Sequence, residues 1–148
     1  MHLRPLTEAD DELLTSLKEQ EDVWESVGAL LLPDTGDAKH LFAVMVDDTA
    51  IGVAGLVRSV ATGGSDFEMF CALKSEAQLQ GYAKQACDLV LAWAFGTLKL
   101  DRVISFIDDT NEGARSLALK IGMKELSAQP PHRTLFVRNR DESPVTTA

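Results

Sequence analysis

One stretch of the sequence, residues 66–97, constrains the fold more than any other. It opens with a strand pattern from Asp66 to Leu73, in which successive side chains point to opposite faces. A turn around Gly81 follows, and apolar residues then recur at helical spacing until about Thr97. The sequence predicts another strand shortly after this helix, and such a crossover makes its two strands parallel. The chain therefore needs a sheet with at least one parallel pair.

Both halves of this stretch predict a face that packs against other elements. In the strand, one face carries Phe67, Met69, Cys71 and Leu73, and the other carries Glu68, Phe70 and Ala72. In the helix, expected from about Leu79, one apolar face gathers Leu79, Tyr82, Ala83, Ala86, Leu89, Val90, Trp93 and Ala94. We expect this helix to lie on the sheet through that face.

The remaining elements predict an α/β fold, a mixed sheet with helices on both faces. Before the central stretch we expect a strand at His2–Leu6, a helix capped by Thr7 with Leu13, Leu14 and Leu17 on one face, a helix at Glu21–Leu31, and a hairpin of His40–Val46 and Ile51–Ser59. After it we expect a strand at Arg102–Ile107, a helix at Glu112–Ile121, and strands near Met123–Leu126 and Thr134–Arg138. The last strand is expected to form an edge open to dimer pairing.

A chain of 148 residues suits one domain. We assign residues 1–139 to it and expect a frayed polar tail at 140–148. The sequence has neither an apolar run of about 20 residues nor an export signal at the start, so we expect a cytoplasmic protein away from membranes. Cys71 and Cys87 lack metal-ligand spacing and the three histidines are scattered, so we expect reduced thiols and no metal.

The net charge of -9 narrows the choice of partners. An acidic surface repels nucleic acid phosphates and acidic lipids, and it attracts a cation such as an amine. The same charge can also serve only to keep the protein soluble.

The turn Gln78–Ala83 is the strongest candidate binding site. Amides at the start of a helix lack partners within the helix and carry partial positive charge. Gly81 at this start predicts a cradle for a diphosphate without a metal. An ordinary strand-to-helix turn has the same residues, and the chain carries neither a Walker motif nor the dinucleotide glycine pattern after its first strand.

Three motifs in order resemble the GCN5-related N-acetyltransferases. Gln78-x-x-Gly81-x-Ala83 is similar to that family's acetyl-coenzyme A motif. The later matches are Trp93–Phe95 with Leu100–Val103, which resemble the RimJ/RimL branch, and Asn111–Ala114 with Leu117–Met123. The resemblance covers about Leu3 to Met123. It implies a GNAT-like fold with a twisted, mostly antiparallel sheet and one splayed parallel pair. It also implies direct transfer of acetyl from acetyl-coenzyme A to a primary amine in a ternary complex.

The resemblance also implies which residues bind the acetyl-coenzyme A. Backbone amides of residues 79–84 would hold the diphosphate, and the pantetheine arm would lie along Met69–Leu73 like an added strand. Asn111 matches a pantetheine-binding asparagine, although it can equally cap the next helix. Lys84 could add charge at the phosphates or be an ordinary solvated lysine. The full set is Met69, Phe70, Cys71, Leu73, Gln78, Leu79, Gln80, Gly81, Tyr82, Ala83, Lys84 and Asn111.

Catalysis requires a base, because an amine is protonated near neutral pH. Glu68 is the candidate, with Asp66 as the weaker alternative, and Glu68 could also be a plain exposed strand residue. Amides near Phe70 and Cys71 could polarise the thioester carbonyl. A nucleophilic role for Cys71 is disfavoured, since no histidine is placed to activate it.

Two departures from the family pattern bear on the activity. Ala118 stands where many members carry a tyrosine acid, and Ala114 stands where relatives carry a serine. Tyr82 faces the sheet and is a poor substitute. A thiolate can leave without an acid, since thiols have a pKa near 8.5. The alternative is a catalytically silent module that binds acyl-coenzyme A.

The acceptor is not specified by the sequence. Trp24, on the second expected helix, is the candidate substrate-binding residue. A protein N-terminus, a polyamine, an aminoglycoside or a basic peptide all fit an acidic surface, and the protein could be a monomer or a homodimer.

Overall fold

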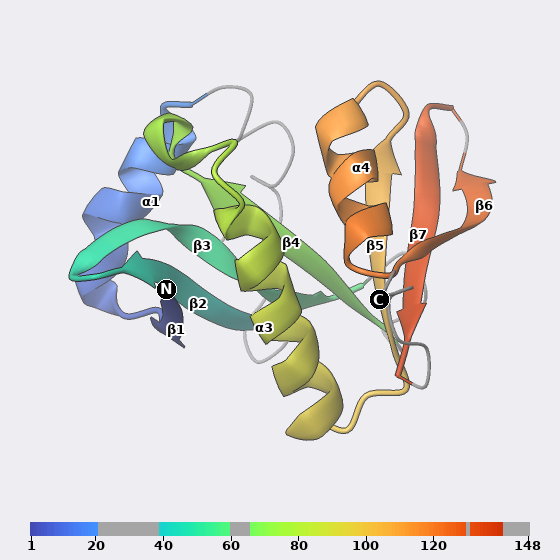
Figure 1. The fold of residues 1–148 in the computed structure, drawn as a ribbon, viewed down its shortest axis with the longest axis horizontal. Helices are drawn as coiled ribbons and strands as arrows, with labels where there is room; N and C mark the ends of the chain where they lie inside the picture. The colour runs from blue at the N-terminus through green and yellow to red at the C-terminus, as the bar shows by residue number, and fades with distance from the viewer. Residues whose placement is uncertain (21–38, 60–65, 130, 141–148) are drawn as a thin grey trace.

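The computed structural model describes residues 1–20, 39–59, 66–129 and 131–140. Within them, seven strands form one sheet in the order β1-β2-β3-β4-β5-β7-β6 (Figure 1). The strands are β1 (His2–Pro5), β2 (Lys39–Val46), β3 (Thr49–Arg58), β4 (Phe67–Leu73), β5 (Arg102–Asp108), β6 (Lys124–Gln129) and β7 (Arg133–Asn139). The helices are α1 (Asp11–Lys18), α3 (Tyr82–Gly96) and α4 (Glu112–Lys120), with short 3-10 turns at Glu8–Asp10 and Ser75–Ala77.

The sheet is antiparallel except between β4 and β5, which are parallel. These are the two strands joined through α3, as the crossover pattern predicts. The predicted fold class, a mixed sheet with one parallel pair and helices on both faces, is confirmed.

Two apolar clusters show how the helices cover the sheet (Figure 1). On one face, Val90 and Ala94 of α3 and Ala118 of α4 pack against the β4 residues Met69 and Leu73. On the other face α1 packs against the sheet, in a cluster formed by Leu13, Leu17, Ala43, Met45, Val53, Val57, Phe70 and Ala72. The two faces of β4 therefore divide as the alternation in its sequence predicts.

The first helix begins later than predicted. The sequence predicts a cap at Thr7, but a 3-10 turn at Glu8–Asp10 comes first and α1 starts at Asp11. The Asp10 carboxylate accepts the Thr7 backbone N–H at 2.8 Å and two bonds from Arg4, at 2.9 and 2.7 Å. Thr7 and Asp10 thus retain half of a capping box, while the carboxylate also ties the turn to β1.

Three predictions are wrong, one about the place of a strand in the sheet and two about leucines expected on the apolar face of a helix. The strand at Thr134–Arg138 is not an edge, because β7 lies between β5 and β6 and pairs with both. In the described sheet the edges are β1 and β6. Leu79 is not on the apolar face of the helix, because α3 starts only at Tyr82; Leu79 lies in the preceding turn and is fully exposed. Leu89, also expected on that face, is 42% exposed.

Some expected elements lie outside the described residues. These are the second helix at Glu21–Leu31, with Trp24, and almost all of the C-terminal tail. Among the helices that the structure describes, none combines the length and the apolar character that a membrane span requires.

Candidate functional site

The sheet divides between β4 and β5. Along β3, seven register pairs hold β4 over its whole length, from Phe67 to Leu73. Along β5, the described register has a single pair, Glu68 with Ile104. Figure 1 shows β4 and β5 close together where they begin and diverging toward their ends, with α3 beside one and α4 beside the other. We call this divergence the fork. It leaves one side of β4 without ladder partners beyond Met69 in the described sheet.

The closed end of the fork is held by side chains. Arg102, the first residue of β5, donates two hydrogen bonds of 2.8 Å each to the carboxylate of Asp66, which is 7% exposed. The Ser105 hydroxyl donates to the Met69 carbonyl at 2.9 Å. Asp66 is thus bound in a two-bond ion pair, and this makes Glu68 the better candidate base.

The turn that joins β4 to α3 has the backbone of an anion-binding concavity. Leu79 and Gly81 both adopt left-handed conformations, with φ of 62° and 84°. Left-handed residues of this kind occur in the backbone nests that bind anions, where successive N–H groups face one side. Within the described residues, the first N–H of this helix start that has an acceptor belongs to Gln85, which donates to the Gly81 carbonyl at 3.3 Å. A methyl group built on Gly81 would meet no atom of the described residues within 4 Å.

Two glutamine side chains support this turn through hydrogen bonds to backbone carbonyls. The side-chain amide of Gln78 donates to the Leu73 carbonyl at 3.1 Å, and that of Gln80 donates to the Glu76 carbonyl at 2.8 Å. Both amides are engaged with backbone on the β4 side of the turn. The family resemblance predicts ligand contacts at these glutamines, and the structure gives their side chains a supporting role for the backbone amides.

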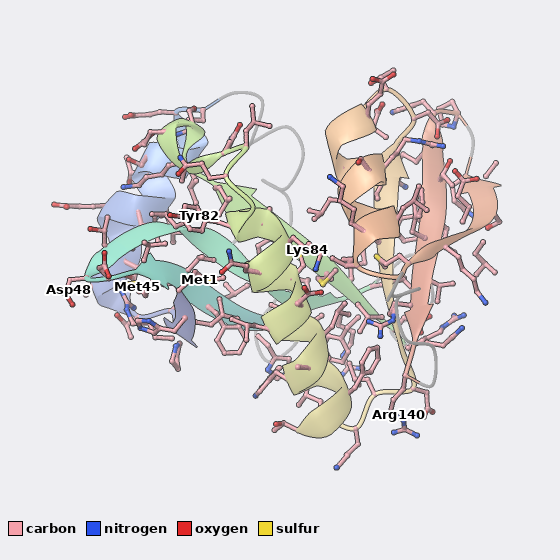
Figure 2. The ribbon with its side chains drawn as sticks, viewed as in Figure 1. Met1, Met45, Asp48, Tyr82, Lys84 and Arg140 are labelled. Atoms are coloured by element: carbon pink, nitrogen blue, oxygen red, sulfur yellow. The ribbon has the colours of Figure 1, made fainter. Side chains whose placement is uncertain are left out.

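Lys84 has a partner along its own helix. Its ammonium lies 2.8 Å from the carboxylate of Asp88, four residues later, and the two side chains are 50% and 43% exposed. Figure 2 shows Lys84 on the side of α3 that looks toward α4 and β5. An exposed pair of this spacing contributes only about 0.3–0.5 kcal/mol, so a phosphate could displace it readily.

Glu68 lies on the sheet face opposite α3, since it alternates with Phe67 and Met69 of the main core. Burial raises the pKa of its carboxyl group. The nearby Ser59 hydroxyl and the Arg133 charge oppose that rise. Ser59 is fully buried, and its hydroxyl lacks the geometry of a full hydrogen bond to any described residue. Glu68 is therefore a half-buried carboxyl group rather than the plain exposed residue considered as the alternative.

The two cysteines lie beside one another, on β4 and α3. Both are free thiols, and Cys87 is buried while Cys71 is partly exposed. The hydrogen bond to Cys71, together with burial, raises the pKa of the Cys87 thiol. A raised pKa keeps a thiol protonated, so Cys87 is a structural residue rather than a nucleophile.

Asn111 directly precedes α4, and Ala118 lies within that helix. The Asn111 side-chain oxygen caps the helix by accepting the Ala114 N–H at 3.1 Å, which is the alternative role considered for it. Its side-chain N–H₂ is not used by that cap and can still serve a ligand. Ala118 is 3% exposed and belongs to the main core, so the position that many relatives give to a tyrosine is closed here.

The structure brings most of the predicted residues together. Met69–Leu73, the Gln78–Lys84 turn and Glu68 all lie on or next to β4, and Asn111 starts the helix across the fork. Trp24 lies outside the described residues. Sequence reasoning missed Ser59, Arg102 and Ser105. The signal for Ser105 was a lone hydroxyl in an otherwise apolar strand run, Val103–Ile107. The described residues contain no group of three or more side chains that could hold a metal ion.

The family comparison agrees with this geometry. A family model described as "Acetyltransferase (GNAT) domain" matches residues 1–124. The chain therefore belongs to the GNAT acetyltransferases. The match identifies the family and not a branch within it. None of the curated protein sequences matches the chain.

Solved structures share the fold. The crystal structure of an acetyltransferase from Agrobacterium tumefaciens str. C58 is 20% identical, with a TM-score of 0.74 over 93% of this chain and 89% of that one. The spermidine N-acetyltransferase from Vibrio cholerae, in complex with CoA and spermine, is 15% identical, with a TM-score of 0.78 over 95% of this chain and 96% of that one. At these identities the likeness is one of fold.

Proposed function

We propose that this protein transfers the acetyl group of acetyl-coenzyme A to a primary amine. The observation that carries the proposal is the position of the fork: the free side of β4 lies directly before a helix start whose amides have no acceptors in the described chain. A diphosphate and a peptide-like arm need these two features in this order. Membership of the GNAT family supports the same interpretation.

In this proposal the backbone of residues 79–84 binds the diphosphate. The left-handed residues Leu79 and Gly81 aim the amides, and Gln78 fixes the turn to the end of β4. The arm then pairs with the free side of β4 at Met69–Leu73, and the Asn111 N–H₂ faces it from α4. Lys84 exchanges Asp88 for a phosphate. Tyr82, Ala83 and Gln80 complete the binding turn.

Glu68 serves as the general base. An ammonium must lose a proton before its nitrogen can attack the thioester, and a base is more effective as its pKa approaches the working pH. Burial moves the pKa of Glu68 in that direction. The backbone N–H groups near Phe70 and Cys71 polarise the carbonyl.

The departing thiolate leaves without a side-chain acid. Ala118 is sealed in the core, so no tyrosine equivalent exists at that position. A thiol with a pKa near 8.5 is a fair leaving group, and water can protonate it afterwards.

The acceptor is a cationic amine, either a small amine or a peptide N-terminus. The net charge of -9 favours such a substrate over an anionic one. The Vibrio cholerae structure of the same fold holds spermine, which makes polyamines the first class to test. The RimJ/RimL resemblance adds protein N-termini to the panel, and Trp24 is the proposed acceptor contact.

The test is an acetylation screen across amine classes, read by release of free coenzyme A. We expect turnover with at least one cationic amine, and about a 10²–10⁴-fold loss in Glu68→Gln. Calorimetry with coenzyme A accompanies the screen. Binding without turnover on any amine would instead establish a silent acyl-coenzyme A-binding module.

A further inference from the structure

We propose that Ser105 is a positioning residue that fixes where β4 and β5 part, and thereby where the thioester is presented. The expected effect of Ser105 on catalysis rests on the proposed function. Its role in the sheet rests on the geometry of β4 and β5 alone. The described ladder has one pair, Glu68 with Ile104. One residue further along both strands, the Ser105 hydroxyl donates to the Met69 carbonyl at 2.9 Å. A side-chain bond thus stands where a longer ladder would place a backbone bond.

This bond ties the strands without closing them. Backbones in a ladder lie about 4.8 Å apart. The Ser105 hydroxyl links the two strands at Met69, one residue past the last ladder pair, Glu68 with Ile104. The Met69 carbonyl is satisfied by this hydroxyl and has no need of a backbone N–H from β5. Ser105 therefore stabilises the end of the ladder at this residue.

Two features of the surrounding strands define where Ser105 lies in the fork. Behind it, the Asp66–Arg102 pair, with two bonds of 2.8 Å, holds the closed end together. Ser105 alternates along β5 with Ile104 and Phe106, which belong to the cluster on the opposite face. Its side chain is thus on the face covered by α3 and α4, from which the pantetheine arm approaches in the proposed function.

Loss of the hydroxyl removes the donor that Ser105 supplies to the Met69 carbonyl, in a partly buried hydrogen bond. In our proposal a backbone N–H of β5 replaces the hydroxyl at this carbonyl, and that pairing extends the ladder. One further residue of ladder moves the closed end by about 3.3 Å. Misplacement of reacting groups by about 1 Å can lower a rate about 10²-fold.

The experiment uses Ser105→Ala, Ser105→Thr and the control Ser127→Ala. Ser127 is an exposed strand serine whose hydroxyl accepts a bond of 2.8 Å from Gln129, far along the chain from the fork. With the best amine from the screen, we expect kcat of Ser105→Ala to fall about 10–100-fold. The affinity for coenzyme A should change less than kcat does, because the diphosphate is held at residues 79–84 and not at the end of the ladder. Ser105→Thr keeps a hydroxyl and should restore most of kcat.

A purely structural role predicts a different result. In that case Ser105→Ala would lower Tm while the kcat of the folded enzyme at low temperature stayed within about twofold of wild type. That outcome, or equal losses in Ser127→Ala, would overturn the proposal.

A second measurement examines the fork without any substrate. Amide hydrogen exchange at Cys71 and Phe106 should change in Ser105→Ala and return toward wild type in Ser105→Thr. Unchanged exchange would also overturn the proposal. If wild type neither binds nor turns over acetyl-coenzyme A, the proposed function fails, and the exchange result alone decides the role of Ser105 in the fork.

Discussion

The side-chain amide of Gln78 donates a 3.1 Å hydrogen bond to the carbonyl of Leu73, the last residue of β4. This bond joins the two parts of the proposed site, the strand that pairs with the pantetheine arm and the turn that holds the diphosphate. The turn of residues 74–81 sets the distance between these two parts. The Gln78 side chain ties this turn back to the end of β4.

Removing the Gln78–Leu73 hydrogen bond should weaken the binding of coenzyme A. A typical hydrogen bond contributes about 1 kcal/mol, so we expect Gln78→Ala to raise the Kd for coenzyme A about fivefold by calorimetry. Gln129→Ala, which removes an amide bonded to Ser127 on the edge strand β6, should leave that Kd unchanged. Equal affinities for Gln78→Ala and wild type would show that the turn holds its shape without this hydrogen bond.

Two glycines with open surroundings offer a matched test of the turn. A Cβ would meet no atom within 4 Å at Gly81 or at Gly96, but only Gly81 has a positive φ, of 84°. We expect Gly81→Ala to lower the free energy of unfolding by about 1 kcal/mol and to weaken coenzyme A binding. Gly96→Ala should be neutral or slightly stabilising. Urea unfolding measures both; equal effects would contradict the left-handed turn.

Glu68 should affect activity and stability in opposite directions. Its folded-state pKa is raised, so the native state holds this proton more tightly than the unfolded chain does. The contribution of Glu68 to folding stability is therefore present below its pKa in the unfolded chain, and it is lost as the pH rises through its pKa in the folded protein. At pH 7–8, Glu68→Gln should be at least as stable as wild type.

The same variant should also differ from wild type in how its activity depends on pH. We expect kcat/KM of wild type to rise with pH along an acid limb positioned above the usual glutamate pKa, and we expect Glu68→Gln to lose that limb. Thermal melting and a pH–rate profile test the pair of effects. A fully active, less stable variant would assign Glu68 to structure.

Asp10 should show the reverse dependence on pH. Hydrogen bonds from the Arg4 guanidinium lower the pKa of Asp10 to about 2, with the Thr7 N–H adding to the effect. A lowered pKa contributes stability above the unfolded value, near 3.8, and this contribution is lost as the pH falls through about 2. Asp10→Asn should lower the free energy of unfolding by about 1–3 kcal/mol at pH 7, with a smaller difference at pH 2. A difference independent of pH would contradict the ion pair.

The local patterns of the sequence were sufficient for most of the fold. Alternation in Phe67–Leu73 predicted which side of β4 meets α3, because that periodicity depends only on the backbone. The position of β7 could not be predicted in the same way. Its place between β5 and β6 follows from pairing with residues that lie about 30 positions away, and no local pattern carries that information.

The site was predicted in outline and not in its details. Gly81 was found because glycine is the residue that a tight turn into a helix favours. Leu79 was misplaced because its apolar side chain fitted the helical period, whereas its backbone lies in a left-handed turn. The Lys84–Asp88 pair follows from i,i+4 spacing and could have been anticipated. Ser105 depends on a contact between strands that are 36 residues apart in the chain, which a single sequence does not reveal.

The central claim, that coenzyme A is held by the start of α3 and the free side of β4, is tested most directly by amide NMR. Titration of the protein with coenzyme A should shift the amide signals of residues 79–84 and of Phe70–Leu73, while those of the β6–β7 hairpin stay in place. Saturable binding that leaves the signals of residues 79–84 unmoved, or no binding at all, would contradict the account.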